Sequence, residues 1–147
     1  MTRNRRHKAD LRAYQAVTGA PYMVARRQMA EMMQQHPLLN SFGIGVFDWR
    51  RKTIEQRQAE LAAGRERLAN AEATVLETAV WLRENIRPIK APTVGSYGMK
   101  HVMEHATGKY VANGEFIAAA LIAGYTFKYV QPNVLFGMSA RDVQRLS

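Results

Sequence analysis

Residues 96–125 read SYGMKHVMEHATGKYVANGEFIAAALIAGY, and this stretch decides the fold. Apolar residues recur at helical spacing in its first part: Met99, Val102, Met103 and Ala106. They predict an amphipathic helix that ends at Gly108. From Asn113 as N-cap to Gly124 as the stop, the second part is apolar on nearly every face. We therefore expect this second helix to be the buried one.

Downstream of this stretch, the sequence predicts a β-hairpin and a short helix. Aromatic residues alternate with polar ones over residues 125–129, a turn follows at 131–133, and residues 134–136 are apolar again. Ser139, with Asp142 three positions later, resembles a capping box that opens a C-terminal helix. We expect residues 91–147 to form a compact C-terminal helical domain with a small β-hairpin.

Upstream, residues 53–87 predict one long helix. Apolar residues occupy every seventh position, here called the heptad seam: Ile54, Leu61, Leu68, Val75 and Leu82. The second apolar position that a coiled coil needs in each heptad is poorly filled, so the seam is only half-specified. At 1.5 Å per residue the helix would be about 50 Å long, which exceeds the core of so small a domain. The helix therefore breaks or finds a partner, and a homodimer through residues 53–87 is expected.

The first 52 residues predict a basic helical hairpin followed by a strand or an ordered loop. Helices are expected over about 7–18 and 22–35, with Gly19 ending the first and Pro21 beginning the second. Residues 38–49 lose the helical pattern. The predicted fold class is mainly α, with an N-terminal unit at 1–52, a long helix or linker at 53–90 and the C-terminal domain at 91–147.

Composition narrows the classes of protein that the chain can belong to. The 147 residues are 47% hydrophobic and include no cysteine, which favours a packed core and excludes disulfides and cysteine-ligated zinc. No apolar run reaches the roughly 18 residues of a membrane span, and the basic start is not followed by the apolar part of a signal peptide. We expect a cytoplasmic location and no membrane partner.

Charge is concentrated near the N-terminus. Ten of the 21 Lys and Arg residues lie in the first 52 positions, and the formal net charge of the chain is +9. Such a chain attracts polyanions, and DNA or RNA backbones are the expected ones. The predicted nucleic-acid-binding residues are Arg3, Arg5, Arg6, Lys8, Arg12, Arg26, Arg27, Arg50, Arg51 and Lys52.

His101-Val102-Met103-Glu104-His105 matches H-x-x-E-H, the inverted zinc-peptidase pattern. On a helix the two histidines lie one turn apart and can share a metal ion, with Glu104 as the base and Glu115 or Asp142 as a third ligand. The same three residues also form the polar face that any amphipathic helix carries. The polar face is the preferred interpretation, and no cofactor is expected.

Aromatic residues are frequent in the last third of the chain: Tyr97, Tyr110, Tyr125, Phe127, Tyr129 and Phe136. Alternating aromatics on a hairpin can stack on the bases of a single strand. More often, such a hairpin packs on a helix to form a core, and this is the preferred interpretation.

Two stretches resemble segments of mobile-element proteins. Residues 96–125, together with PNVLF at 132–136, resemble a segment of uncharacterised proteins from bacterial phages, plasmids and integrated elements. KADLRAYQAVTGAPYMVARR, residues 8–27, resembles a helical hairpin at the start of actinobacterial mobile-element proteins. The resemblance implies a genetic setting, and it carries no activity and no functional residue.

The leading hypothesis is a non-enzymatic, nucleic-acid-associated accessory protein of a mobile element, which binds phosphates through its basic N-terminal region. An alternative is a protein-interaction module that binds or inhibits a host or defence protein. A third is a zinc hydrolase that uses His101, Glu104 and His105.

Overall fold

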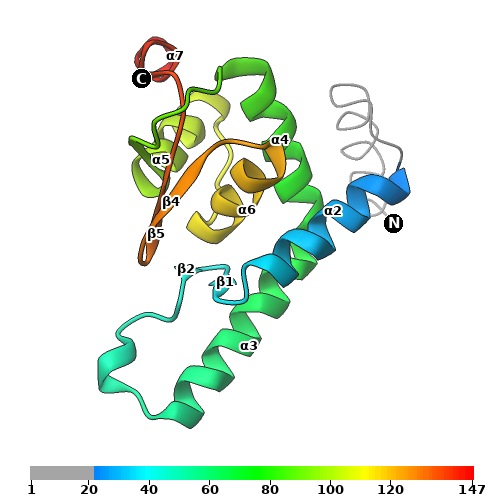
Figure 1. Cartoon of the computed structure of the whole chain (residues 1–147), viewed down its shortest axis with the longest axis vertical. Coiled ribbons are helices and arrows are strands. Elements are labelled where there is room, and N and C mark those ends of the chain that lie inside the picture. The colour runs from blue at the N-terminus through cyan, green and yellow to red at the C-terminus, as the bar shows by residue number, and fades with distance from the viewer. Residues whose placement is uncertain (1–21) are drawn as a thin grey trace.

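The computed structural model describes residues 22–147 (Figure 1). This part of the chain is mainly helical, as predicted. Its helices are α2 (Tyr22–Gln35), α3 (Ile54–Asn70), α4 (Glu72–Asn85), α5 (Ser96–Thr107), α6 (Asn113–Ala123) and α7 (Ala140–Leu146). Its strands are β1 (Leu39–Asn40), β2 (Gly43–Ile44), β3 (Val94–Gly95), β4 (Phe127–Val130) and β5 (Asn133–Phe136). The helix expected over 7–18 lies outside the described residues.

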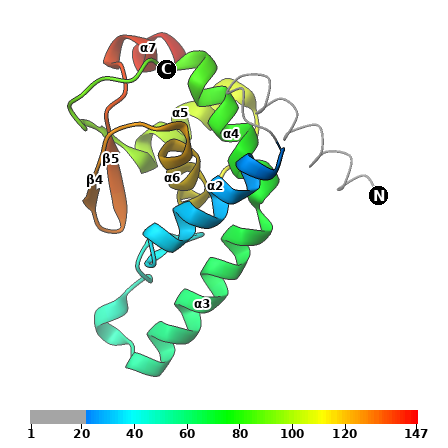
Figure 2. The ribbon, with the colours of Figure 1, turned by 45° about the vertical axis from the view of Figure 1, so that its right-hand side comes forward.

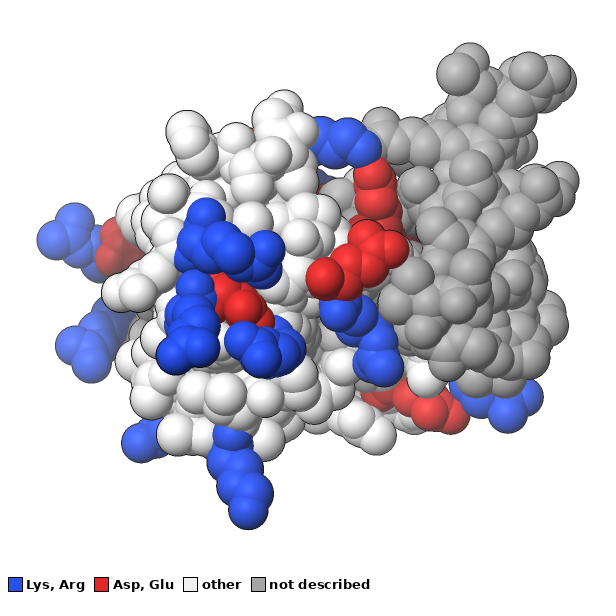
Figure 3. Space-filling view, turned by 90° about the horizontal axis from the view of Figure 1, so that it is seen from above, with Lys and Arg blue, Asp and Glu red and all other residues white. Residues whose placement is uncertain are grey.

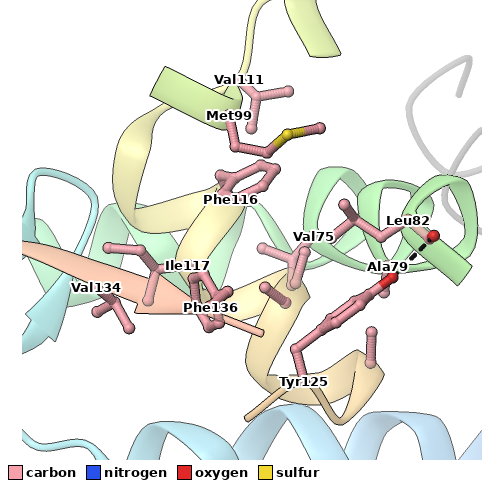
Figure 4. Close-up of a cluster of buried hydrophobic side chains, with 14 of the residues drawn as sticks. Val75, Ala79, Leu82, Met99, Val111, Phe116, Ile117, Tyr125, Val134 and Phe136 are labelled. Carbon is pink, nitrogen blue, oxygen red and sulfur yellow. Dashed lines mark hydrogen bonds between the residues drawn. The ribbon is translucent and has the colours of Figure 1, made fainter. Parts of the chain in front are cut away.

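Helix α6 lies at the centre of the core, which confirms the expectation from its apolar sequence. Phe116 and Ile117 have no exposed surface, and neither do the three alanines that follow them. Because alanine side chains are small, α4 can approach α6 closely, and this helix pair makes the most extensive contact in the fold. Figure 4 shows Phe116 and Ile117 of α6 in one cluster with Val75 and Leu82 of α4. Helix α2 crosses nearby and adds Met29 and Met32 to the same core (Figure 2).

The helix expected over 53–87 breaks at Ala71. Helix α3 ends at Asn70, Ala71 has φ −95° and ψ 20°, and α4 begins at the next residue. The burial of the heptad seam changes before this break, between Leu61 and Leu68: Leu68, Val75 and Leu82 are fully buried in the core of this chain, whereas Ile54 is 65% exposed. The C-terminal half of the seam is therefore covered by other parts of the same chain, and it is not available to a helix of a second chain.

Two small antiparallel sheets accompany the helices. Strands β4 and β5 pair over the segment where the hairpin was expected, and β3, which the sequence did not indicate, adds a third strand beside β5. Strands β1 and β2 form a separate short hairpin. Helix α7 begins after Ser139, whose hydroxyl accepts the Asp142 N–H at 3.3 Å, as the capping pattern predicted.

The turn between β1 and β2 is fixed by Asn40, whose side chain is buried between α3 and α6. Its Nδ2 donates to three carbonyls within the turn, and its Oδ1 accepts the Phe42 N–H at 3.0 Å. The neighbouring Ser41 joins the two helices through its backbone, because its N–H donates to the Gly64 carbonyl and its carbonyl accepts the Gly114 N–H. Both glycines are needed for this approach, since a Cβ on either would meet Asn40 atoms at 2.6 Å or less.

Beyond β2 the chain leaves the compact part and forms a loop at the far end of α3 (Figure 1). This loop contains the 3₁₀ turn Trp49–Arg51. Helix α7 lies at the opposite end of the longest axis of the molecule (Figure 1). The fold therefore separates the charged residues of this loop from those of α7.

Candidate nucleic-acid interface

The projecting loop, residues 47–57, is here called the tip loop, and it contains three of the predicted binding residues. Asp48 adopts the left-handed conformation, with φ 54°, and opens the 3₁₀ turn. Thr53 then caps α3: its hydroxyl accepts the Gln56 N–H, and the Gln56 side chain accepts the Thr53 N–H. Both ends of the turn are thus held by the backbone and by this cap, and Trp49, Arg50 and Arg51 between them are exposed.

Two arginines pack on the indole of Trp49. The guanidinium carbon of Arg57 lies 4.9 Å from the ring centroid, and that of Arg50 lies 5.5 Å from it. Arg57 is also held by its Nε, which donates to the Trp49 carbonyl at 2.7 Å. Both contacts lie within the range of cation–π attraction. Trp49 remains 43% exposed, and the two arginines place positive charge beside its exposed surface.

Lys52 is engaged within the protein. Its Nζ donates to Glu60 of α3 at 2.6 Å and to the Phe47 carbonyl at 2.7 Å, and it lies 5.7 Å from the Phe47 ring centroid. The ammonium is therefore committed to fastening the tip loop onto α3. Arg50 and Arg51 remain exposed, as a phosphate contact requires, with Asp48 as the ion-pair partner of Arg51 at 3.9 Å.

The structure does not bring the other described basic residues of the N-terminal region to the tip loop. Arg26 and Arg27 are exposed on α2, and Arg26 forms an ion pair with Glu72 at the start of α4. The part of α3 beyond the tip loop, residues 58–70 or about 20 Å at helical rise, separates Glu72 from the tip loop. The remaining predicted residues lie outside the described part of the chain: Arg3, Arg5, Arg6, Lys8 and Arg12.

A second basic surface, which the sequence analysis missed, lies at the opposite end of the molecule. Figure 3 shows Lys and Arg side chains gathered around acidic ones on this face. Asp142 of α7 is buried and accepts hydrogen bonds from the Arg87 N–H at 2.9 Å and from its Nε at 3.2 Å, and Arg145 lies 3.8 Å away. The hydrogen bonds from Arg87 hold the pKa of Asp142 below its usual value. We call Arg87 and Arg145, which both approach Asp142, the α7 arginine cluster.

The H-x-x-E-H residues lie on the partly exposed face of α5, where Glu104 has structural partners. Its carboxylate accepts hydrogen bonds from Lys100 Nζ at 3.2 Å and from the Val111 N–H at 3.0 Å, and His101 Nδ1 lies 3.0 Å away. Burial raises the pKa of Glu104, but these hydrogen bonds outweigh it and leave the pKa lowered. His105 is exposed.

The two candidates for a third metal ligand are both engaged elsewhere. Glu115 accepts the Ala112 N–H at the start of α6, and Asp142 binds Arg87. Within residues 22–147 no three His, Asp or Glu side chains are grouped so that they could hold a metal ion. Glu104 therefore joins α5 to the loop before α6.

The aromatic residues of the last third divide into two groups. Tyr125 is buried, donates through its hydroxyl to the carbonyls of Leu82 and Ile86, and has its pKa raised by burial to about 12. Phe136 is also fully buried. The other four are exposed to a large extent: Tyr97, Tyr110, Phe127 and Tyr129.

No protein-family model matches the chain, and no curated protein and no solved structure is detectably similar to it. Among residues 22–147, no helix has the length and the apolar composition needed to cross a bilayer.

Proposed function

We propose that the protein is a non-enzymatic accessory protein that binds nucleic acid, with the tip loop as its main contact surface. The observation that supports this most is that the tip loop displays cations and aromatic rings together. Arg50 and Arg57 pack on the exposed Trp49, and Phe47 beside them is 67% exposed. Nucleic acids present anionic phosphates and flat bases, and proteins bind them with this combination of side chains.

The tip loop is also held in place before any ligand binds. Lys52 fastens it to Glu60, Thr53 caps the adjoining helix, and Arg57 is bonded to the Trp49 carbonyl. A surface that is already ordered loses less side-chain entropy on binding, so more of its interaction energy contributes to affinity. The N-terminal arginines and the α7 arginine cluster are proposed as additional phosphate contacts, and a mobile element is the proposed genetic setting.

The experiment that tests this function is a fluorescence-anisotropy titration of the full chain with DNA and RNA oligonucleotides at two salt concentrations. Replacing Arg50 and Arg51 by Ala removes two phosphate contacts. We expect weaker binding of every sequence and a slope of log affinity against log salt that is less steep by about 1.5, since each contact contributes about 0.7–0.9.

A matched variant separates the tip loop from net charge. Lys90 and Lys128 are exposed and lie outside the tip loop, and replacing both by Ala removes the same charge. This double variant should retain most of the affinity. Equal weakening in both double variants would show that only total charge matters, and an unchanged affinity of the Arg50 and Arg51 variant would refute the role of the tip loop.

The exposed half of the heptad seam favours a second candidate, a protein-interaction module. Ile54 is exposed and Leu61 is half-buried, so one face of α3 presents apolar surface outside the core. This face is where we propose that a host or defence protein, or a second copy of the chain, would pack. Recovery of a partner that survives nuclease treatment and high salt, and is lost on Ile54→Ser substitution, would support this candidate.

A further inference from the structure

A groove of about 590 Å³ opens between α5, the loop before α6 and the turns at 41–42 and 132–133. Segments that are far apart in the sequence meet there because the Gly114 N–H donates to the Ser41 carbonyl and holds the β1–β2 turn against α6. The groove is lined mainly by aromatic rings and amides: Phe42, Tyr97, His101, Tyr110, Asn113 and Asn133. Such a lining suits a flat ring that carries hydrogen-bonding groups on its edge.

A buried lysine orders the tyrosines of this groove. Lys100 Nζ donates to Glu104 and to the Val111 carbonyl, and it lies 4.9 Å from the ring centroid of Tyr110 and 5.6 Å from that of Tyr97. These hydrogen bonds hold the ammonium in place, and its cation–π attraction in turn positions the two rings. Tyr110 nevertheless remains 77% exposed and Tyr97 54% exposed. Their rings are therefore held in position and are open to a ligand.

The amide of Asn113 adds a polar element to the groove. Its Nδ2 donates to Asn133 Oδ1 at 3.0 Å and to the Phe42 carbonyl at 3.2 Å. Its Oδ1 is the one buried side-chain polar atom of the described residues without a hydrogen-bond partner. A buried acceptor that stays unpaired is destabilising, and such atoms are uncommon in folded proteins. The Asn113 Nδ2 group joins the turns at 41–42 and 132–133 beside the groove.

The groove continues into the tip loop through Phe42. This side chain lines the groove, and its ring meets the ring of Phe47 edge-on, with the centroids 5.8 Å apart and the planes 78° apart. Phe47 in turn lies under the Lys52 ammonium at the base of the loop that carries Trp49 and its arginines. Exposed aromatic rings therefore run from the groove to the cationic tip.

We infer that the groove and the tip loop together bind a single-stranded nucleic acid, with bases stacked on Tyr97 and Tyr110 and phosphates bound by the arginines of the tip loop. This inference rests on the proposed function, and it names the form of nucleic acid. The base faces of a duplex are covered by their neighbours, whereas those of a single strand are free to stack on protein rings. Only a single strand uses both parts of this surface.

The test compares a labelled single-stranded 20-mer of mixed sequence with the same sequence as a duplex, using the full chain. Tyr110 is highly exposed, so Tyr110→Ala leaves the core intact. We expect this variant to lose at least about fivefold in affinity for the single strand, the lower end of what one stacked base contributes. Its salt slope and its affinity for the duplex should not change. Tyr110→Phe, which keeps the ring, should bind like the wild type.

The Arg50 and Arg51 variant gives a different pattern, which separates this inference from the proposed function. It should weaken both nucleic acids and flatten both salt slopes. If the wild type binds the single strand and the duplex equally, and neither Tyr110→Ala nor Tyr97→Ala changes either affinity while the arginine variant does, the inference is overturned and the proposed function stands.

Absence of nucleic-acid binding at both salt concentrations would overturn the proposed function and this inference together. Anionic phospholipid vesicles are included as a further probe, because cations beside exposed aromatic rings also suit a membrane surface. Binding to vesicles but not to oligonucleotides would identify the tip loop as a membrane contact and would overturn the inference.

Discussion

Gly114→Ala is expected to destabilise the protein strongly, although alanine is the better helix former. A Cβ at this position would lie 1.7 Å from the Asn40 carbonyl oxygen, 2.7 Å from the Asn40 carbonyl carbon and 2.8 Å from that of Ser41. All three are backbone atoms, so no side chain can rotate away to make room. The β1–β2 turn would have to move off α6.

The size of the effect follows from these contacts. Forcing extra atoms into a packed site costs about 1–3 kcal/mol. Displacing the turn also breaks the hydrogen bond from the Gly114 N–H to the Ser41 carbonyl, which contributes about 1 kcal/mol. Together these give a loss of about 3 kcal/mol, and for a domain of this size that lowers Tm by about 10 °C.

Gly98→Ala is the matched control. Gly98 lies in α5, and apart from its chain neighbours and the backbone of its own helix, no atom of the described residues would come within 4 Å of its Cβ. Alanine there should be neutral or stabilising by up to about 1 kcal/mol. Both variants would be unfolded thermally, with the transition followed by circular dichroism. If Gly114→Ala unfolds within 2–3 °C, roughly 1 kcal/mol, of the wild type, the close approach of the turn and α6 is not present in solution.

Three further predictions concern the core and its charges. Because the pKa of Asp142 is lowered in the folded protein, its stabilising effect is present above its ordinary value of 3.8 and is lost as pH falls through the folded value; Asp142→Asn should flatten the acid limb of a plot of unfolding free energy against pH. The pKa of Tyr125 is raised from 10.0 to about 12, so the free energy of unfolding should decline as pH rises from 10 to 12. Tyr125→Phe should remove this decline. It should also cost about 1–2 kcal/mol, because the hydrogen bonds to the Leu82 and Ile86 carbonyls are lost. Leu82→Ala should cost about 2–5 kcal/mol in urea unfolding and Ile54→Ala less than about 0.5, and equal costs would show that the heptad seam is buried along its whole length.

Elements with local signals could be predicted from the sequence. Helix α5 ends at Gly108 and α6 at Gly124, both with positive φ, because glycine enters the left-handed conformation without a Cβ clash. The break at Ala71 has no such signal, since alanine favours a helix. Leu68 and Val75 on either side of it are both buried in the one core, so tertiary packing decides where the helix breaks.

The candidate site could be predicted only in part. Arg50 and Arg51 stand out in the sequence as neighbouring charges, and they are exposed in the structure. The α7 arginine cluster depends on a contact between Arg87 and Asp142, which are 55 residues apart, and no local pattern indicates such a pair. The groove likewise gathers rings from separate segments, and its formation depends on the small volume of Gly114.

Asn40 contacts α3 at Gly64, where the helix passes from its exposed part to its buried part. Residues of α3 beyond Gly64 toward the tip loop are outside the core, whereas Leu68 on the other side of Gly64 is fully buried. The contact at Gly64 therefore joins the exposed part of α3 to the β1–β2 turn, whose Ser41 N–H donates to the Gly64 carbonyl. Because the same turn forms one wall of the groove, a displacement of the tip-loop end of α3 would reach the groove through Phe42.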